Sequence, residues 1–243
     1  MKKASTIASL LLMLILSSCG LPVRLTEVRG SGNIQTETRY VSGFQSVDLN
    51  GLGTLTIVQG DKESLEITTD ENLLEYIQSE VSGGNLKLGV QEYVNLRPTD
   101  DIVYQLTVTD LNSIVTSGLG NIQMQSLETG DLRLEISGAG NIVIDDLSAD
   151  NLDLGISGLG SVELAGRISQ QDVRISGAGN YKAEDLFSRE ASIKISGTGS
   201  AKVWAADKLS VDLSGMGSVD YYGDPILIMD ISGMGKVNSL GSR

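Results

Sequence analysis

The amino-acid sequence predicts an all-β protein, a parallel β-helix or closely related β-solenoid of about seven to eight coils. An N-terminal β-rich cap with one short helix is expected to precede the repeats. A Ser-Gly-x-Gly string recurs every 18 to 20 residues, apolar residues alternate with polar ones around it, and 29 of the 243 residues are glycine while only three are proline. This length suits one domain, or at most two.

The Ser-Gly-x-Gly string defines the length of one coil. Its seven copies are 20, 20, 19, 20, 18 and 18 residues apart. Around each serine, the positions one and three before it and five and seven after it are apolar in most copies. Such a unit has one apolar face and can bury it only by stacking on its neighbours. Leucine-rich repeats have similar periods, but these units lack a helical half. The copies begin at Ser117, Ser137, Ser157, Ser176, Ser196, Ser214 and Ser232, and a variant occupies residues 50–54.

Each glycine pair is expected to form a corner between two strands. We predict glycine there because the corner requires a backbone with φ > 0, which other residues rarely adopt. The corner should recur at the same place in every coil, so that the glycines stack. The predicted corner glycines are Gly118, Gly120, Gly138, Gly140, Gly158, Gly160, Gly177, Gly179, Gly197, Gly199, Gly215, Gly217, Gly233 and Gly235.

The residue between the two glycines is apolar in most copies. We expect it to point inward and fill the corner of the core; pointing outward, it would form an apolar ridge and a candidate interface. These residues are Leu119, Ala139, Leu159, Ala178, Thr198, Met216 and Met234. The corner serines are expected to form one polar ladder, and the residues after the second glycine a second.

Residues 58–104 interrupt the period and are expected to cap the open end of the stack, because an uncovered sheet edge invites aggregation. Alternation predicts strands over 65–69, 86–90 and 102–108, and a short helix over 71–79. The repeats are expected over 111–240. Little sequence follows the last coil, so a homo-oligomer through the C-terminal coil is one expectation.

The N-terminal residues have the layout of a secretory signal. Lys2 and Lys3 precede an apolar run over 7–16, which is too short to be read as a spanning helix. Small residues then lead directly into Cys19, the only cysteine of the chain. This pattern resembles the bacterial lipobox, in which signal peptidase cuts before the cysteine and the cysteine is diacylated. The alternative is an ordinary signal peptide with a chance cysteine.

The lipobox interpretation predicts a signal peptide over 1–18 and a lipidated N-terminus and tether over 19–42. Two or three acyl chains on Cys19 would form a stable anchor in a membrane. Gly20, rather than an aspartate, follows the cysteine, as in lipoproteins sent to the outer membrane of a Gram-negative cell. The expected location is the cell envelope, or the outer membrane if the cell is Gram-negative.

The composition excludes several classes of function. The chain has no histidine, so Ser-His-Asp triads, Cys-His dyads and histidine-ligated zinc cannot be built. We expect no metal and no cofactor. The formal net charge is −13, or −15 once Lys2 and Lys3 are removed (−13 − 2), which argues against nucleic acid as a partner. One cysteine allows no intrachain disulfide framework.

An aromatic pair is the candidate binding surface. Trp204 and Tyr222 hold the same place on adjacent coils and point outward by parity, beside Lys202 and Asp220. Such rings can stack on a sugar or anchor a protein partner; the alternative is that they pack locally. At two further outward positions, acidic and basic residues follow one another from coil to coil, and we expect them to form ladders of ion pairs on the surface. They are Glu163, Lys182, Lys202 and Asp220, and Arg174, Lys194, Asp212 and Asp230.

The sequence resembles the head GIN domain family, described as heads of autotransporter adhesins, over 43–240. The resemblance rests on Phe44-Gln45-Ser46-Val47, Ile57-Val58-Gln59-Gly60-Asp61, Asn72-Leu73-Leu74, Val81-Ser82-Gly83-Gly84-Asn85-Leu86-Lys87-Leu88 and the Ser-Gly-x-Gly corners. It implies a β-helical, secreted or surface-tethered domain, often on a lipoprotein. It implies no catalytic residues.

We therefore expect a non-enzymatic, envelope-anchored lipoprotein that serves adhesion or ligand binding at the cell surface. Its expected partners are the membrane, through the lipid anchor, and a glycan or surface protein. A structural, self-associating envelope protein is the alternative. A polysaccharide-processing enzyme is a third possibility. The pairs of adjacent acidic residues do not favour it, because neighbouring side chains along a strand point to opposite faces and make a poor two-carboxylate site. These pairs are Asp100-Asp101, Asp145-Asp146 and Glu184-Asp185.

Overall fold

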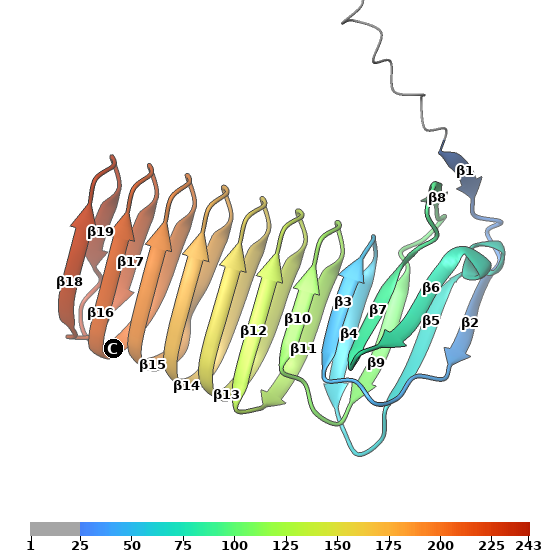
Figure 1. Ribbon diagram of the computed structural model, residues 1–243, viewed down its shortest axis with the longest axis horizontal. Coiled ribbons are helices and arrows are strands. Elements are labelled where there is room, and N and C mark those ends of the chain that lie inside the picture. The colour runs from blue at the N-terminus through green and yellow to red at the C-terminus, as the bar shows by residue number, and fades with distance from the viewer. Residues whose placement is uncertain (1–24) are drawn as a thin grey trace, which may run out of the picture.

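The computed structural model describes residues 25–243 as one long rod of stacked β-coils (Figure 1). The predicted signal peptide over 1–18 and the lipidation site Cys19 lie outside the described residues. The all-β solenoid is confirmed, with one short 3₁₀ helix, η1 (Glu71–Tyr76). In the described part of the chain, no helix has the length and apolar character needed to cross a membrane.

The strands follow one another along the rod and are numbered in chain order. They are β1 (Thr26–Arg29), β2 (Ile34–Arg39), β3 (Ser46–Asn50), β4 (Thr54–Gln59), β5 (Ser64–Asp70), β6 (Ile77–Ser82), β7 (Asn85–Val90), β8 (Val94–Arg97), β9 (Val103–Val108), β10 (Ser113–Thr116), β11 (Asn121–Glu128), β12 (Asp131–Ile136), β13 (Asn141–Ile156), β14 (Ser161–Ile175), β15 (Asn180–Ile195), β16 (Ser200–Leu213), β17 (Ser218–Tyr222), β18 (Ile226–Ile231) and β19 (Lys236–Ser239).

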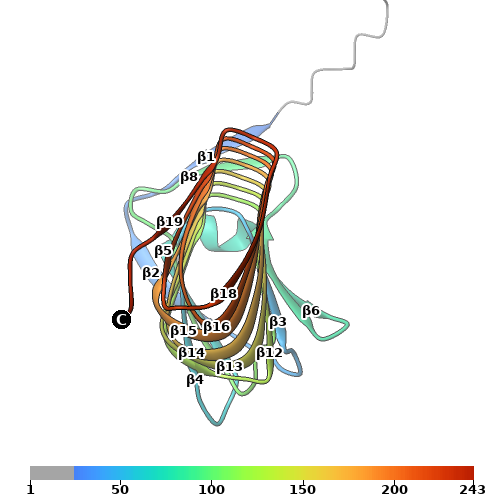
Figure 2. The same cartoon turned by 90° about the vertical axis from the view of Figure 1, so that its left-hand side faces the viewer.

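Neighbouring coils pair in parallel, one repeat apart. Asn141 pairs with Ser161, and Ser161 in turn with Asn180. Seen end-on, the coils superpose as a flattened loop with the glycine corners at one edge (Figure 2). We call the opposite edge the lower bend. The seven Ser-Gly-x-Gly corners bound six full turns, and the layers β3–β4 and β7–β9 extend the stack at its N-terminal end.

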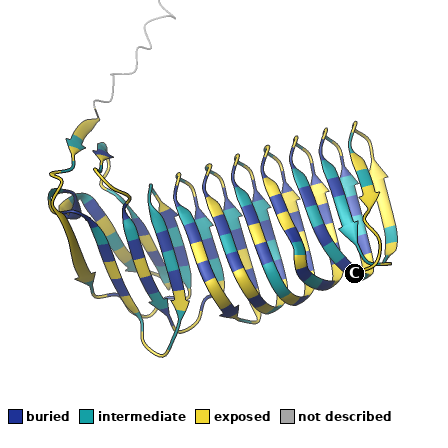
Figure 3. Ribbon diagram, turned by 180° about the vertical axis from the view of Figure 1, so that it is seen from behind, coloured by how far each residue is buried: buried dark blue, intermediate teal, exposed yellow. Residues whose placement is uncertain are grey.

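The apolar columns meet inside this loop and form one continuous core (Figure 3). Burial contributes ~1.5–3 kcal/mol for each large apolar side chain, so the stacked coils stabilise one another. At the lower bend the sequence predicts a looser turn near Leu127, Leu147 and Leu186. The chain there stays in strand conformation and buries all three leucines. The copy that begins at Ser157 has 19 residues, one fewer than the copies on either side. The chain is shortened at this bend, where Gly166 has φ +124°.

The glycine corners are confirmed, but their predicted cause is wrong. None of the fourteen corner glycines is among the described residues with φ in the left-handed region. Glycine is required because successive corners stack too closely for a side chain. A Cβ on Gly138 would stand 2.0 Å from the carbonyl oxygen of Gly118, and one on Gly140 2.1 Å from that of Gly120. The Ala139 amide donates across the same gap to the Gly118 oxygen at 3.1 Å.

The residue between the two glycines points outward, so the inward prediction is wrong. Leu119, Leu159, Met216 and Met234 are 60–77% exposed, and Ala139, Ala178 and Thr198 are exposed as well. The core does not need them, because the second glycine of each pair packs against the preceding coil. Gly160, for example, is buried, and a Cβ on it would stand 2.8 Å from a methyl group of Ile136.

The second polar ladder is present beside the corners. The Asn141 amide donates to the Asn121 side-chain oxygen at 3.0 Å, and the Ser161 hydroxyl donates to Asn141 at 2.7 Å. Farther along, the Ser200 hydroxyl donates to the Asn180 side chain at 2.7 Å. The corner serines stack through backbone hydrogen bonds, as between the Ser137 amide and the Thr116 oxygen at 3.0 Å.

The N-terminal segment closes the far end of the stack with antiparallel strands. β6 pairs with β7, β5 with β9, and β2 with β5. The tether predicted over 19–42 is wrong for residues 26–39, since β1 pairs with β8 and β2 forms part of the main sheet. The predicted helix over 71–79 is shorter: η1 ends at Tyr76, and Ile77 begins β6.

Candidate functional site

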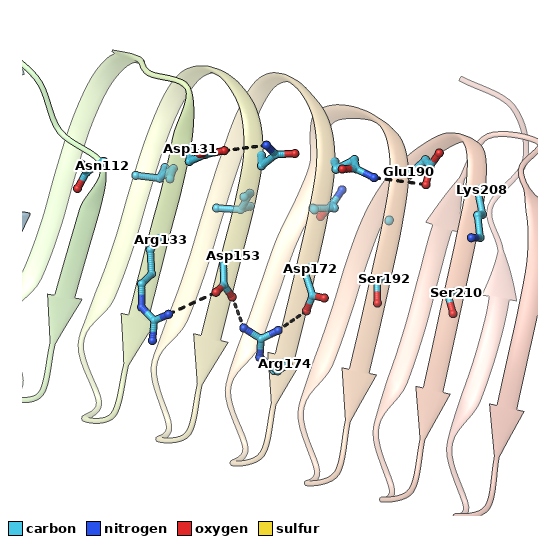
Figure 4. A pocket seen from close by; sticks show the side chains of 16 residues that line it. Asn112, Asp131, Arg133, Asp153, Asp172, Arg174, Glu190, Ser192, Lys208 and Ser210 are labelled. Atoms are coloured by element: carbon cyan, nitrogen blue, oxygen red, sulfur yellow. Dashed lines mark hydrogen bonds and ion pairs between the residues drawn. The ribbon is translucent and has the colours of Figure 1, made fainter.

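A groove of about 740 Å³ runs across consecutive coils on one flank of the rod (Figure 4). We call it the flank groove. Its walls come from the strands that rise toward the corners: β12 and the second halves of β13, β14, β15 and β16. Its lining residues are Asn112, Asp131, Leu132, Arg133, Asn151, Leu152, Asp153, Gln170, Gln171, Asp172, Arg174, Glu190, Ala191, Ser192, Lys208 and Ser210.

Strand register brings the polar lining into columns. Alternate residues of each rising strand point outward, and parallel pairing places each on its counterpart one coil away. One column is Asp131, Asn151, Gln170, Glu190 and Lys208, and the next is Arg133, Asp153, Asp172, Ser192 and Ser210. Along the rod the groove therefore presents two outward polar side chains on each coil, and their chemical type changes from coil to coil.

Ion pairs hold the charged side chains of the groove in place. Arg133 contacts Asp153 at 3.4 Å, and Arg174 contacts both Asp153 and, at 2.5 Å, Asp172. These side chains are 41–54% exposed, so solvent screens each pair, which contributes only ~0–1 kcal/mol to stability. The main effect of the pairs is to orient the two guanidinium groups along the groove.

A glycine in the adjoining column gives Arg174 its room. Glu135, Gly155 and Arg174 occupy the same position on three successive coils. The backbone does not require glycine at position 155, because a Cβ there would meet only the Glu135 side chain, at 3.7 Å. The missing side chain leaves a hollow beside Arg174, lined also by Ser137 and Ser157. The guanidinium can therefore lie back across one coil to Asp153.

A buried polar network forms part of the groove floor. Gln171 is 2% exposed and stands in register with Leu152 and Ala191. Its amide donates to the Ser188 hydroxyl at 2.8 Å, and its oxygen accepts from the Tyr181 hydroxyl at 2.8 Å. Ser188 donates onward to the Trp204 carbonyl oxygen at 2.7 Å. Burial raises the pKa of Tyr181 far above its usual range, so its hydroxyl remains a donor at every physiological pH.

The predicted aromatic surface lies outside this groove and is partly covered. Trp204 pairs in register with Tyr222, as expected from their positions. The Arg243 guanidinium lies over both rings, 5.5 Å from the centroid of Trp204 and 5.4 Å from that of Tyr222. Phe187 packs edge-on against Trp204 with 5.1 Å between ring centroids. The local packing that was the alternative interpretation is therefore present.

The charged neighbours of the aromatic pair belong to a surface ladder. Lys202 pairs in register with Asp220, and its ammonium group contacts Glu184 at 3.4 Å. One coil earlier, Lys182 contacts Glu163 at 3.4 Å. The second predicted column is also in register, and within it Lys194 and Asp212 are 2.6 Å apart. Hydrogen bonding to Asp212 raises the pKa of Lys194.

The acidic pairs do not assemble a metal site. Over residues 25–243 there is no group of three or more cysteine, aspartate or glutamate side chains placed to hold a metal ion. Asp100 and Asp101 are exposed, and the Asp100 carboxylate accepts from the Asp101 amide at 2.9 Å. Asp145 and Asp146 are likewise exposed.

The sequence prediction of the site included Arg174 only as a surface charge and missed the flank groove. The signal was present in the aligned copies: the positions four and six before the serine are polar in the five copies from Ser137 to Ser214. These positions read as ordinary outward columns of a solenoid. Their concavity depends on how the rising sheet curves between the corner and the lower bend, which the alignment does not encode.

The comparisons with known proteins agree with the fold. The model of the family described as "Putative auto-transporter adhesin, head GIN domain" matches residues 43–225. A search of the curated proteins found no match.

Solved structures from Bacteroides and Parabacteroides species share the architecture. A "putative adhesin" from Bacteroides fragilis NCTC 9343 is 24% identical, with a TM-score of 0.83 over 88% of this chain and 100% of its own. A "putative lipid binding protein" from Parabacteroides distasonis ATCC 8503 is 25% identical, with a TM-score of 0.76 over 88% and 100%. A "putative adhesin" from Parabacteroides merdae ATCC 43184 is 25% identical, with a TM-score of 0.71 over 88% and 99%.

Proposed function

The chain belongs to the family described as "putative auto-transporter adhesin, head GIN domain", and we propose that it is an envelope-anchored, non-enzymatic binding protein. In this proposal Cys19 carries the lipid anchor and the solenoid is displayed at the cell surface. The flank groove then holds the ligand, a glycan or an extended segment of a surface protein. The family and two of the three neighbours described above bear the names of adhesins, the third bears that of a lipid binding protein, and none of them is named as an enzyme.

The groove is the observation that carries this proposal. It extends over five strands and offers polar side chains at the same two positions of each coil. Polar positions at this regular spacing suit an extended polymer with many hydroxyl groups, because amides, carboxylates and guanidinium groups together can donate to and accept from hydroxyls. The groove contains Arg133, Arg174 and Lys208 against four carboxylates (Asp131, Asp153, Asp172 and Glu190). This balance favours a neutral polymer over a polyanion such as nucleic acid.

The proposal is tested by binding of the mature chain to an array of host and envelope polysaccharides, followed by titration with the best hit. Arg174→Ala removes a central donor of the groove and should weaken binding at least 10-fold. Lys182→Ala is the matched control, since Lys182 forms a similar exposed ion pair with Glu163 on another column. Equal affinity of both variants and the wild type would exclude the groove as the binding site.

Self-association is the second candidate function, and the last coil favours it. Ile226, Ile228 and Met229 of β18 are 52–73% exposed, and within the described residues β18 and β19 have no strand beyond them. An open edge of a sheet is a template for pairing with another chain. In sedimentation velocity, concentration-dependent association that Ile228→Lys abolishes and the control Val58→Lys retains would support it. A monomer at every concentration would exclude it.

A further inference from the structure

The seven corner residues form an exposed apolar row along one edge of the rod, which we call the corner ridge. Its members are Leu119, Ala139, Leu159, Ala178, Thr198, Met216 and Met234. At about 4.8 Å per coil, the row is roughly 29 Å long. The large side chains are among the most exposed apolar groups of the molecule: Leu159 is 70% and Met234 77% exposed. Single exposed apolar side chains are ordinary on a soluble domain, but a contiguous row of them is a candidate contact surface.

The edge that carries the ridge is almost free of charge. In each copy the ridge residue is flanked by serine and glycine on one side and by glycine and asparagine or serine on the other. Lys236, in the last copy, is the single exception. The chain has a formal net charge of −13, and its charged columns begin only two residues before the serine and six after it. An uncharged, apolar edge on an acidic protein can approach lipid without bringing a carboxylate to the surface.

The described chain begins at this same edge. Figures 1 and 2 both show the start of β1 level with the row of corners. Two further apolar groups lie there: Leu25 is 61% and Tyr93 60% exposed, and the Thr26 amide donates to the Tyr93 oxygen at 2.8 Å. Tyrosine is enriched at the water–lipid boundary of membrane proteins. Apolar side chains are thus exposed at the N-terminal end of the same edge as well.

The proposed anchor restricts how far this edge can stand from the membrane. Cys19 is six residues before Leu25, and six residues of extended chain span at most ~20 Å. We propose that the corner ridge lies on the lipid surface, so that the rod runs along the membrane and not away from it. This inference rests on the lipid anchor of the proposed function and adds the orientation of the domain.

A second copy fits the ridge less well than lipid does. A strip about 29 Å long and one side chain wide offers on the order of 300 Å², well below the ~800 Å² per partner of a stable protein interface. A bilayer sets no such minimum once a lipid anchor supplies the attachment. The orientation also suits the proposed ligand, because the groove lining lies on the flank of the rod and its columns run from coil to coil, parallel to the row of corners (Figure 4).

The chain offers a direct test with one reporter cysteine. In the acylated protein the Cys19 sulfur carries lipid, so an introduced cysteine is the only free thiol. Leu159→Cys places an environment-sensitive fluorophore on the ridge. Ser148→Cys is the matched control, since Ser148 is exposed at the lower bend on β13, the strand that leads into the corner of Leu159. Both full chains are purified with their lipid and reconstituted in phosphatidylcholine vesicles containing a spin-labelled lipid quencher.

We expect the label at position 159 to be blue-shifted by about 10 nm or more and quenched by the lipid at least threefold more than the label at position 148. Equal quenching at the two positions would overturn the ridge inference. A label at position 159 whose blue shift grows with the amount of protein per vesicle, and which the lipid does not quench, would show that the ridge contacts a second copy instead. The mass of the N-terminal peptide separates the two hypotheses: an acylated chain without quenching refutes the ridge alone, and an unacylated chain refutes the anchor and the ridge together.

Discussion

The carbonyl oxygen of Gly138 lies 1.9 Å from the place where a Cβ on Gly158 would stand, one coil away. Each corner is thus a direct backbone-to-backbone contact with the next, supported by the hydrogen bond from the Leu159 amide to the same oxygen at 3.0 Å. The stack can repeat at the spacing of a parallel sheet only if every corner lacks a side chain at this point.

Replacement of Gly158 should therefore destabilise the rod strongly. Gly158→Val forces two coils apart at a place where neither backbone can move alone, and we expect a loss of about 3 kcal/mol or more in the free energy of unfolding. Gly130→Val is the control, since a Cβ on Gly130 meets nothing within 4 Å. Urea denaturation measures both. Equal stability of the two variants would refute close stacking as the reason for glycine.

The buried network around Gln171 should show strong coupling. Gln171→Leu matches Leu152 in register with it but leaves the buried Tyr181 hydroxyl without its acceptor, while Ser188 keeps its bond to Trp204; the loss should be about 1–3 kcal/mol. Adding Tyr181→Phe should recover part of that loss, because it removes the unpaired hydroxyl. A double-mutant cycle in urea measures the coupling. Additive effects of the two substitutions would contradict the network.

Asp70 should make the cap sensitive to acid. Burial alone would raise its pKa, but hydrogen bonds from the Thr99 side chain, the Thr99 amide and the Gly32 amide outweigh it, so the pKa is lowered below the usual 3.8. The charged carboxylate of Asp70 therefore stabilises the cap fully above about pH 4, and this stabilisation is lost as the pH falls through the folded-state pKa of Asp70. Asp70→Asn should cost about 2 kcal/mol at pH 7.

The same Asp70→Asn variant should differ less from the wild type at pH 2.5, because this pH lies below the ordinary pKa of an aspartate, where the stabilisation from the lowered pKa of Asp70 is diminished. Thermal unfolding at the two pH values measures the change. The control is Asp61→Asn, at an exposed carboxylate, which should leave stability unaltered at both. A deficit of Asp70→Asn that is equally large at pH 2.5 and pH 7 would show that the carboxylate charge is not what stabilises the cap.

The Arg243 contact should report through tryptophan fluorescence. Trp204 is the only tryptophan of the chain, so its emission is unambiguous. Arg243→Ala removes the guanidinium from both rings and should increase the acrylamide quenching constant of Trp204 about twofold or more. Arg189→Ala, at an exposed arginine paired with Asp207, is the control. An unchanged quenching constant would mean that Arg243 does not cover the aromatic pair in solution.

Lipidation of Cys19 remains a prediction, because the residue lies outside the described part of the chain. We expect the mature N-terminal peptide to begin at Cys19 and to carry two or three acyl chains, and Cys19→Ser to accumulate as the uncleaved precursor. Mass spectrometry of the membrane fraction measures both. A mature chain cleaved elsewhere, with an unmodified cysteine, would support the ordinary signal peptide.

The period, the strands and the corners are predictable from the sequence because each coil repeats the same burial pattern. The physical cause of the corner glycines is not, since Gly138 needs no unusual φ and its constraint comes from Gly118 one coil away. Leu159 was expected inside because it is apolar; it lies outside because Gly160 already fills the corner.

The N-terminal strands and the flank groove were not predicted from the sequence, for other reasons. β2 is exposed along most of its length, so its residues lack the apolar alternation that identifies a strand, and its pairing with β5 is a long-range contact. The flank groove is built from polar columns whose individual residues are ordinary surface types. Arg174 acquires its orientation from the missing side chain of Gly155, a relationship between two coils that no single copy of the repeat displays.

Display of the groove outside the cell is the central claim, and accessibility on intact cells tests it most directly. Ser192→Cys places a free thiol in the flank groove, to be labelled with a membrane-impermeant maleimide before and after lysis. Labelling of intact cells at the level of lysed cells is the predicted result. Labelling only after lysis would place the groove inside the envelope, contradict a role in adhesion and turn the search for its ligand toward envelope polymers.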